Sequence, residues 1–332
     1  MDLTMMIMWM GFTLAAYSVV GNDVIQTLGT FLTSNEEKVS WYVLWAFAAT
    51  IMAVTLVYGW IQYDGDVSYQ KLIGDLSENS MADPKYPDPR NIPGFNWVYV
   101  LPPLVLMVIT RIGIPVSTSF LILTFFSPKN LGDMVIKSMS GYIVAFVAAI
   151  VLYVFITKSL EKRFIDNPIT AKERKWWTVA QWGSTGFLWT QWLAQDFANI
   201  YVYLPRQLDG ASLAVSLVIL LALLGYIFYS RGGAIQGIVR AKTNTADIRS
   251  ATFVDLSYGI ILYFFKELNN IPMSTTWVFL GLLAGREIAL RYNLLNTVPK
   301  ATLKDLGKDL AKVFLGLAIS IALVYLIRWF NG

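Results

Sequence analysis

The chain has no cysteine and no histidine among its 332 residues. The absence of cysteine excludes disulfide bonds, thiol catalysis and thiolate metal sites. The absence of histidine excludes the usual proton shuttle and the usual protein ligand of zinc. Any proton or ion chemistry in this chain must therefore use carboxylates, amides and hydroxyls.

Charged residues are also scarce, at 14% of the chain, whereas hydrophobic residues make up 56%. A soluble domain could not bury this much apolar surface, so the composition predicts an all-α integral membrane protein. The first four residues have no basic region and no small-residue cleavage pattern, so the first apolar stretch is expected to remain as a span. Runs long enough to cross a bilayer, about 17–25 residues, lie at 3–33, 40–61, 97–126, 135–157, 176–205, 211–230, 251–290 and 309–329.

The linkers between these runs differ in charge. The linker 158–175 has six Lys or Arg against three acids, and 231–249 has four against one, whereas 62–96 has six acids against three Lys or Arg. Basic loops stay in the cytoplasm, so the two basic linkers are expected inside and 62–96 outside. We therefore expect a first transmembrane repeat at 1–157, a basic cytoplasmic linker at 158–175 and a second transmembrane repeat at 176–332.

Two of the apolar stretches each contain a single acidic residue and no basic one. It is Asp23 in the stretch 3–35 and Asp196 in the stretch 176–205, at the same depth in each. A carboxylate inside hydrocarbon costs roughly 2.5–3.5 kcal/mol even on the milder insertion scales, so the pair predicts a functional site, most simply for a cation. The amides beside them supply hard oxygen ligands of the kind that suit sodium, namely Asn22, Gln26, Gln195 and Asn199.

A second motif also occurs twice, once in each of the runs 97–126 and 251–290. The pattern Ile-Pro-x-Ser-Thr-(Ser/Thr)-aromatic ends at Phe120 in the first run and at Trp277 in the second. Proline breaks a helix, and the Ser or Thr after it can cap the next one, which predicts a re-entrant hairpin. The start of a helix inside the membrane favours an anion, because free N–H groups and the positive dipole end face it. The candidate anion-binding hydroxyls are Ser117, Thr118, Ser119, Ser274, Thr275 and Thr276.

These runs also predict a topology. If each hairpin enters and leaves on one side, each half has three crossings plus a hairpin, and the two halves insert in opposite orientations. Both termini then lie outside. The predicted fold is an all-α integral membrane protein of two inverted repeats, each with a broken first helix and a re-entrant Ser/Thr-rich hairpin.

The four motifs resemble those of the inorganic phosphate transporter (PiT-type) family, over the range 21–285. Each half of that family has a Gly-Ala-Asn-Asp-x-Ala-Asn-Ala element and a later Pro-x-Ser-(Ser/Thr)-(Ser/Thr)-His element. The resemblance implies that Asn22, Asp23, Gln26, Gln195, Asp196 and Asn199 bind sodium, and that the six hydroxyl residues hold phosphate. The chain departs from the family in replacing one Asn of each element by Gln26 or Gln195, and each family histidine by Phe120 or Trp277. It looks like a divergent member.

Residues and resemblance together predict a secondary active transporter, not an enzyme, that imports a small inorganic oxyanion with sodium across the plasma or inner membrane. Phosphate is the first candidate, and sulfate and bicarbonate follow. No covalent cofactor and no nucleic-acid partner are expected, and a homodimer is left open. Three alternatives stay open: coupling to protons carried by aspartate, a non-transporting sensor or scaffold on the same fold, and an intramembrane aspartyl protease, although the Gly-x-Gly-Asp element of that protease is absent.

Overall fold

The computed structural model describes residues 2–74, 79, 82–111, 116–156, 164, 167–231, 247–268 and 274–331. Within this part of the chain all regular structure is helical, as predicted. The longer helices are α1 (Leu3–Asn35), α2 (Trp41–Gln62), α4 (Leu101–Arg111), α5 (Thr118–Phe126), α6 (Leu131–Ile156), α8 (Ala171–Tyr201), α9 (Gly210–Tyr229), α11 (Ile248–Leu268), α12 (Thr275–Leu295) and α13 (Lys300–Asn331). Short 3-10 turns η1 (Pro89–Asn91), η2 (Trp97–Val100) and η3 (Pro128–Asn130) lie before α4 and α6.

Polar residues set where several of these helices begin. The Asp2 carboxylate accepts a 2.7 Å hydrogen bond from the Met5 N–H at the start of α1. Thr170 and Glu173 form a reciprocal capping box at the start of α8. These side chains satisfy N–H groups that a helix leaves unpaired at its first turn.

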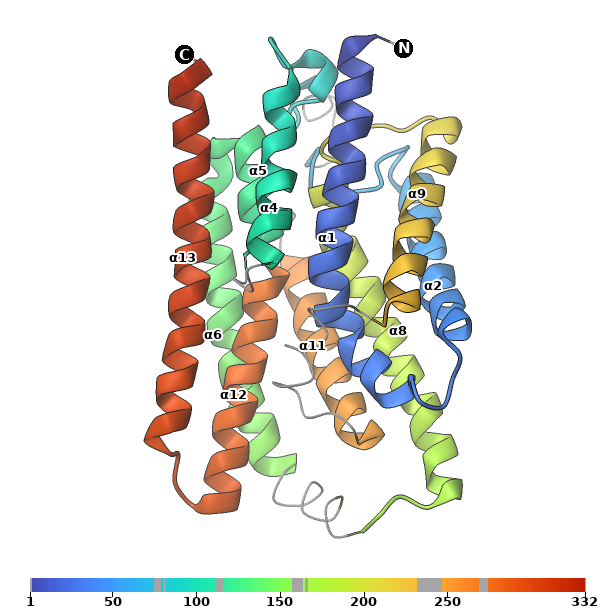
Figure 1. Cartoon of the computed structure of the whole chain (residues 1–332), viewed down its shortest axis with the longest axis vertical. Helices are drawn as coiled ribbons and strands as arrows, with labels where there is room; N and C mark the ends of the chain where they lie inside the picture. Colours follow the sequence, from blue (N-terminus) through green and yellow to red (C-terminus); the bar gives the residue numbers. More distant parts are fainter. Residues whose placement is uncertain are drawn as a thin grey trace.

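The helices form one bundle with both chain termini at the same end (Figure 1). The hairpin of α4 and α5 occupies the half of the bundle nearer the termini, and the hairpin of α11 and α12 occupies the opposite half. The described ends of the basic linker 158–175, at the end of α6 and the start of α8, lie at the end away from the termini, and the start of α11, after the linker 231–249, lies in the same half (Figure 1). This is the arrangement that the predicted topology requires.

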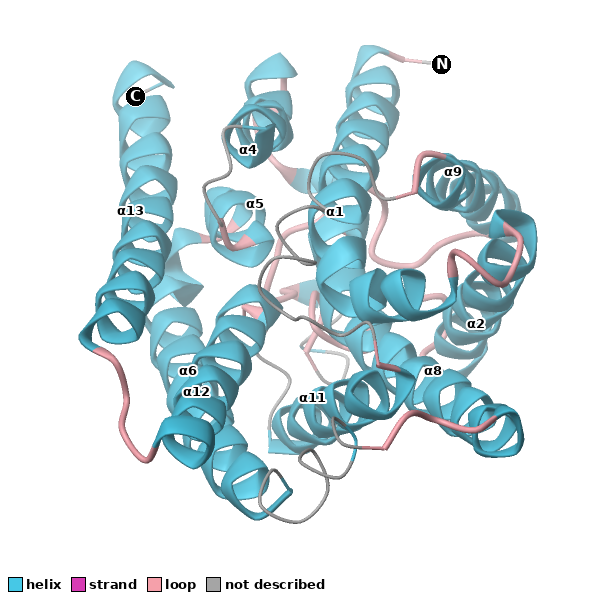
Figure 2. Cartoon of the chain, turned by 60° about the horizontal axis from the view of Figure 1, so that its bottom comes forward, coloured by secondary structure: helices cyan, strands magenta, loops and turns pink. Residues whose placement is uncertain are grey.

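Equivalent helices of the two halves make equivalent contacts. Helix α4 packs on α1 as α11 packs on α8, and α5 packs on α13 as α12 packs on α6. Figure 2 shows α11 beside α8 and α12 beside α6 from the second viewpoint. Reciprocal pairs of this kind are expected from a duplicated chain, and the inverted repeat itself stays a prediction.

One detail of the predicted fold is wrong. The first long helices of the two halves, α1 and α8, are each continuous and are not broken at the aspartate motifs. Neither helix contains proline, and the glycines in them cost a helix much less than proline does. The amide and carboxyl side chains therefore project from intact helices.

The outer surface of the bundle is apolar. In the described part of the chain, four helices are long and apolar enough to cross a membrane: Leu3–Asn22, Trp41–Gln62, Pro128–Val154 and Gly210–Tyr229. Val54 on α2, Ile136 on α6 and Val218 on α9 are 63%, 70% and 66% exposed. Large exposed apolar surfaces are rare on soluble monomers, so these helices face lipid in a multi-pass membrane protein.

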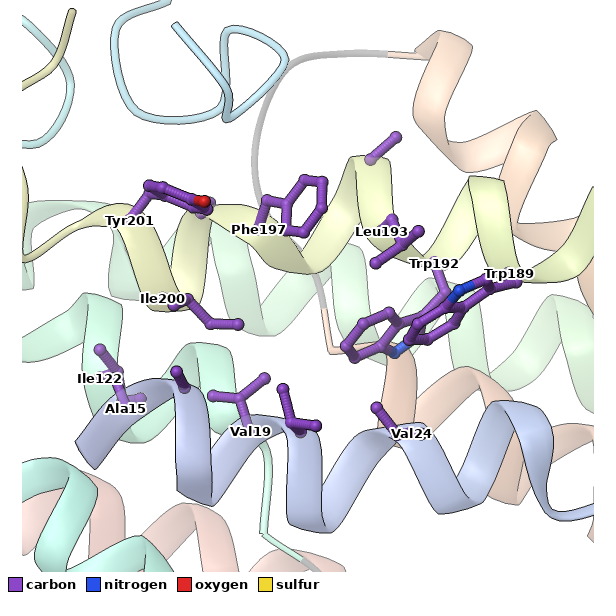
Figure 3. Close-up of a cluster of buried hydrophobic side chains, with 14 of the residues drawn as sticks. Ala15, Val19, Val24, Ile122, Trp189, Trp192, Leu193, Phe197, Ile200 and Tyr201 are labelled. Carbon is purple, nitrogen blue, oxygen red and sulfur yellow. The ribbon is translucent and has the colours of Figure 1, made fainter. Parts of the chain in front are cut away.

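The centre of the bundle is the contact between α1 and α8. Ala15, Val19 and Val24 of α1 face Leu193 and Ile200 of α8 (Figure 3). On the same helix the indole rings of Trp189 and Trp192 stack, with their centroids 4.9 Å apart. This packing fixes the face of α8 that carries the second aspartate motif.

The described parts of the acidic loop 62–96, with the end of α2, contact the connection between α8 and α9. The Leu208 N–H donates to the Gly65 carbonyl at 3.0 Å, and the Trp60 indole N–H donates to the Leu208 carbonyl at 2.7 Å. The Asp88 carboxylate accepts from the Arg206 N–H at 3.0 Å. The loop therefore ties the two halves together at the end that carries the termini.

Candidate functional site

The two hydroxyl-rich segments each begin a helix, as their sequences predict. The Ser117 hydroxyl caps α5 by accepting from the Phe120 N–H at 3.2 Å. The Ser274 hydroxyl caps α12 in the same way, accepting from the Trp277 N–H at 3.3 Å. The proline-containing turns before them, 112–115 and 269–273, lie outside the described residues.

The starts of these two helices lie next to each other. The rings of Phe120 and Trp277 are in edge contact, with their centroids 5.7 Å apart and their planes at 76°. All six candidate anion-binding residues, 117–119 and 274–276, are buried. The two segments therefore meet inside the bundle.

Helix α8 brings the second aspartate motif to both segments. The Asn199 amide donates to the Thr118 hydroxyl at 3.0 Å and also to the Asp196 carboxylate. The Thr275 side chain interacts with the same carboxylate. Asp196 thus lies between the positive N-terminal ends of α5 and α12, where a negative charge is stabilised.

Several buried polar atoms at this place have no hydrogen-bond partner in the protein. They are the amide nitrogen and oxygen of Gln195, Oδ2 of Asp196, Oδ1 of Asn199 and the Thr276 hydroxyl. A buried polar atom without a partner costs about 1–3 kcal/mol, so a group of them indicates a place for a ligand. Three of these atoms are oxygens from one turn of α8, which suits a cation.

The first aspartate motif is placed less completely. Asn22 is buried on α1, and its amide donates to the Val116 carbonyl, just before α5, at 3.4 Å. Gln26 is half-buried on the same helix. The side chain of Asp23 lies outside the described residues. The structure thus brings Asn22 to the first hydroxyl segment, and the predicted role of Asp23 stays a prediction.

Two features of α8 and α11 were not predicted from the sequence. Gln191 Oε1 and Trp192 Nε1 are also buried without a partner, one turn before Gln195. Asp255 of α11 is buried and accepts hydrogen bonds from the hydroxyls of Thr30 on α1 and Thr185 on α8. The signal for Asp255 was an acid inside the apolar run 251–290, but it has no counterpart in the first half.

Comparison with known proteins supports the fold. No protein-family model matches the chain, and no curated protein matches it. Among solved structures the chain is similar to the sodium-dependent phosphate transporter, with a TM-score of 0.59 and 14% sequence identity, covering 99% of this chain and 100% of that one. A likeness at this identity concerns the fold alone. The chain therefore has the fold of a membrane transporter, which agrees with the resemblance found in its motifs.

Proposed function

We propose that the chain is a secondary active transporter that imports a small inorganic oxyanion, phosphate first, together with sodium. The observation that carries the proposal is the convergence of Asp196 and Asn199 with Thr118 and Thr275. The sodium-dependent phosphate transporter of similar fold supports both the substrate and the coupling ion. The membrane is expected to be the plasma or inner membrane, with both termini outside.

The anion is assigned to the starts of α5 and α12. Each of these ends presents backbone N–H groups, a positive dipole end and buried hydroxyls. Together these groups recognise a tetrahedral oxyanion without needing a basic side chain. The unpartnered Thr276 hydroxyl supplies a further donor.

Sodium is assigned to the oxygens of α8 beside that site. Gln195, Asp196 and Asn199 each have a buried side-chain oxygen without a partner. Mixed carboxylate and amide oxygens are ligands of hard cations. Asn22, Asp23 and Gln26 are proposed as the corresponding sodium ligands of the first half.

The position of Asp196 accounts for coupling. Its carboxylate lies at the helix ends that would hold the anion, so the bare charge would repel an oxyanion. At an effective dielectric constant near 20, two unit charges 4 Å apart interact by about 4 kcal/mol. A sodium ion on Asp196 removes this repulsion, and the anion in turn favours sodium binding.

The test is uptake of radiolabelled phosphate by the purified chain in proteoliposomes. An inward sodium gradient should drive uptake, whereas a proton gradient alone should not. Sulfate and bicarbonate in excess should compete less well than unlabelled phosphate. If none of these anions is transported, with or without sodium, the result would favour a sensor or scaffold instead of a transporter.

Asp196→Asn and Asp23→Asn should each abolish sodium-driven uptake while the protein remains folded and inserted. The substitution keeps a similar shape but removes the charge that neutralises the cation. Asp133→Asn is the matched control, because Asp133 is an exposed acid in the first turn of α6. Full sodium-dependent transport by both site variants would exclude these aspartates as sodium ligands.

A further inference from the structure

A cleft with a volume of about 1080 Å³ lies between α12 and α13, away from the aspartate motifs. Its walls are apolar along part of their length, with Leu283 on α12 and Leu310 and Val313 on α13. Because α12 runs from the middle of the bundle to the end away from the termini and α13 runs back (Figure 1), these residues form its deeper part.

Charged residues alternate with these apolar residues and also line the part of the cleft nearer that end of the bundle. Two of the cations are paired across a helix turn: Arg291 with Glu287 and Lys308 with Asp305, each at 2.8 Å. The lining also contains Arg286, Lys312 and Asp309. The described lining therefore has four cations against three acids.

Helix α13 extends the positive charge of the cleft beyond its lining. Lys300, Lys304, Lys308 and Lys312 follow one another at intervals of four residues, and all four are exposed. Residues at this spacing lie on one face of a helix. The basic face of α13 continues from the cleft toward its first turn.

The charge distribution along the chain places this face at a membrane boundary. It lies at the same end of the bundle as the described ends of the basic linker 158–175 (Figure 1), which is expected in the cytoplasm. The cytoplasmic leaflet carries anionic lipids, and basic pockets between transmembrane helices on this side bind their headgroups.

We propose that the cleft between α12 and α13 binds one anionic phospholipid. The headgroup phosphate lies at Lys308 and Lys312, and an acyl chain lies along the deeper residues Leu283 and Val313. The apolar walls favour a lipid over free phosphate, which has no apolar part to bury. The excess of positive charge favours an anionic lipid over a zwitterionic one.

The test uses native mass spectrometry of the full chain in detergent, with phosphatidylglycerol and phosphatidylcholine as probes. One phosphatidylglycerol should stay bound, and phosphatidylcholine should bind at least about tenfold more weakly. The double variant Lys308→Gln and Lys312→Gln should weaken phosphatidylglycerol binding by about tenfold or more, since each charge near an anionic surface contributes about 1 kcal/mol. Thermal unfolding checks that the variant is folded.

The matched control is the double variant Lys300→Gln and Lys304→Gln. It removes the same charge from the same helix face, but neither residue lines the cleft. Phosphatidylglycerol binding should then fall less than threefold. An equal loss in both double variants would show attraction to the whole surface and would overturn the proposal.

Filling the cleft gives a test that does not depend on charge. Leu306 lines the cleft and is half-buried, so Leu306→Trp should displace the lipid and leave the chain folded. Displacement of phosphatidylglycerol by inorganic phosphate would overturn the proposal in favour of an anion site. Mass photometry would measure the oligomeric state of the same variant. If Leu306→Trp abolished a dimer while the lipid content stayed constant, the cleft would bind a second copy of the chain, and the lipid proposal would be overturned.

Discussion

Two buried aspartates in this protein differ in how their oxygens are used. Asp255 has both carboxylate oxygens occupied by threonine hydroxyls, one from α1 and one from α8. Asp196 has Oδ1 bonded to Asn199 and Oδ2 without a hydrogen-bond partner. Buried polar atoms are normally paired within the protein. We therefore expect Asp255 to serve the structure and Asp196 to be the carboxylate that binds the proposed ligand.

Thr185→Val should destabilise the protein by about 1.5–3 kcal/mol, because it removes a hydrogen bond to a buried charge. Its carboxylate partner Asp255 would keep the bond from Thr30 but lose the one from Thr185. Thr190→Val on the same helix is the control, since Thr190 donates only to its own helix, to the Gly186 carbonyl at 2.9 Å. Thermal and denaturant unfolding in detergent would measure both, and an equal loss in the two variants would contradict the structural role of Asp255.

Gln195→Leu should separate ligand binding from stability. Both polar atoms of Gln195 are buried without partners, so replacing them with apolar atoms removes a cost of about 1–3 kcal/mol. In sodium-free buffer the melting temperature should stay the same or rise. Sodium that binds the folded wild type should raise its melting temperature, and this sodium-dependent rise should disappear in the variant.

The control for this experiment is Gln207→Leu. Gln207 is exposed and bonds to Asp64 in the acidic loop, so its replacement should leave the sodium-dependent rise intact. A rise of full size in Gln195→Leu would remove Gln195 from the proposed sodium ligands.

The candidate residues of α8 could be predicted from the sequence, whereas the role of Asp255 could not. Asp196 is recognisable because the same kind of motif occurs at Asp23, and a repeated acid in an apolar stretch needs an explanation. Asp255 has no repeat, and its partners Thr30 and Thr185 are distant in sequence. Only the packing of α1, α8 and α11 brings the three together.

At the scale of helices, the starts of α5 and α12 were predictable and the continuity of α1 and α8 was not. A proline followed by Ser and Thr specifies a new helix by local chemistry. The aspartate motifs contain no such break, and polar side chains do not interrupt the backbone hydrogen bonds of a helix. The breaks in α1 and α8 were expected at the aspartate motifs. Neither helix contains a residue that would cause such a break.

Helix α12 is positioned by its close contact with α6. A Cβ on Gly281 would collide with the backbone carbonyl of Tyr142, and one on Gly285 would collide with that of Phe146. Small residues four apart allow membrane helices to approach this closely. The contact holds the start of α12, where the Ser274 N–H donates to the Ser138 hydroxyl of α6 at 2.8 Å.

Gly285→Ala should therefore destabilise the protein by about 1–3 kcal/mol, because the added methyl group meets backbone that cannot turn away. Gly307→Ala on α13 is the control, since nothing lies within 4 Å of the added carbon. Alanine favours a helix over glycine by up to about 1 kcal/mol, so this control should be neutral or stabilising. If the unfolding curves of the two variants coincided, close packing at Gly285 would be ruled out.

At the scale of the molecule, the arrangement follows from counting apolar runs. Two hairpins that return to the side they came from predict both termini at one end and both basic linkers at the other, and Figure 1 shows the two termini at one end. The count could not predict which helices touch. The contacts of α5 with α13 and of α12 with α6 join the first half to the second. They depend on side-chain packing, which cannot be predicted from the length of the apolar runs.

This arrangement predicts access to the site from each side in turn. The hairpin of α4 and α5 comes from the end with the termini, and that of α11 and α12 comes from the opposite end (Figure 1). Thr118 and Thr275 are each only 2% exposed, so a cysteine at either position can react only after a movement. We expect Thr118→Cys to react with an impermeant maleimide from outside and Thr275→Cys from inside.

The chain has no native cysteine, so each label reports one position. Asp209→Cys at the exposed start of α9 and Lys304→Cys on α13 are controls that should react at constant rates. Sodium with phosphate should change the rates at Thr118→Cys and Thr275→Cys in opposite directions, because a ligand shifts the balance between conformations that bind it differently. The opposite outcome is that the labelling rates at both site positions do not change with sodium and phosphate and that phosphate uptake is absent. The chain would then be a sensor or scaffold with a transporter fold.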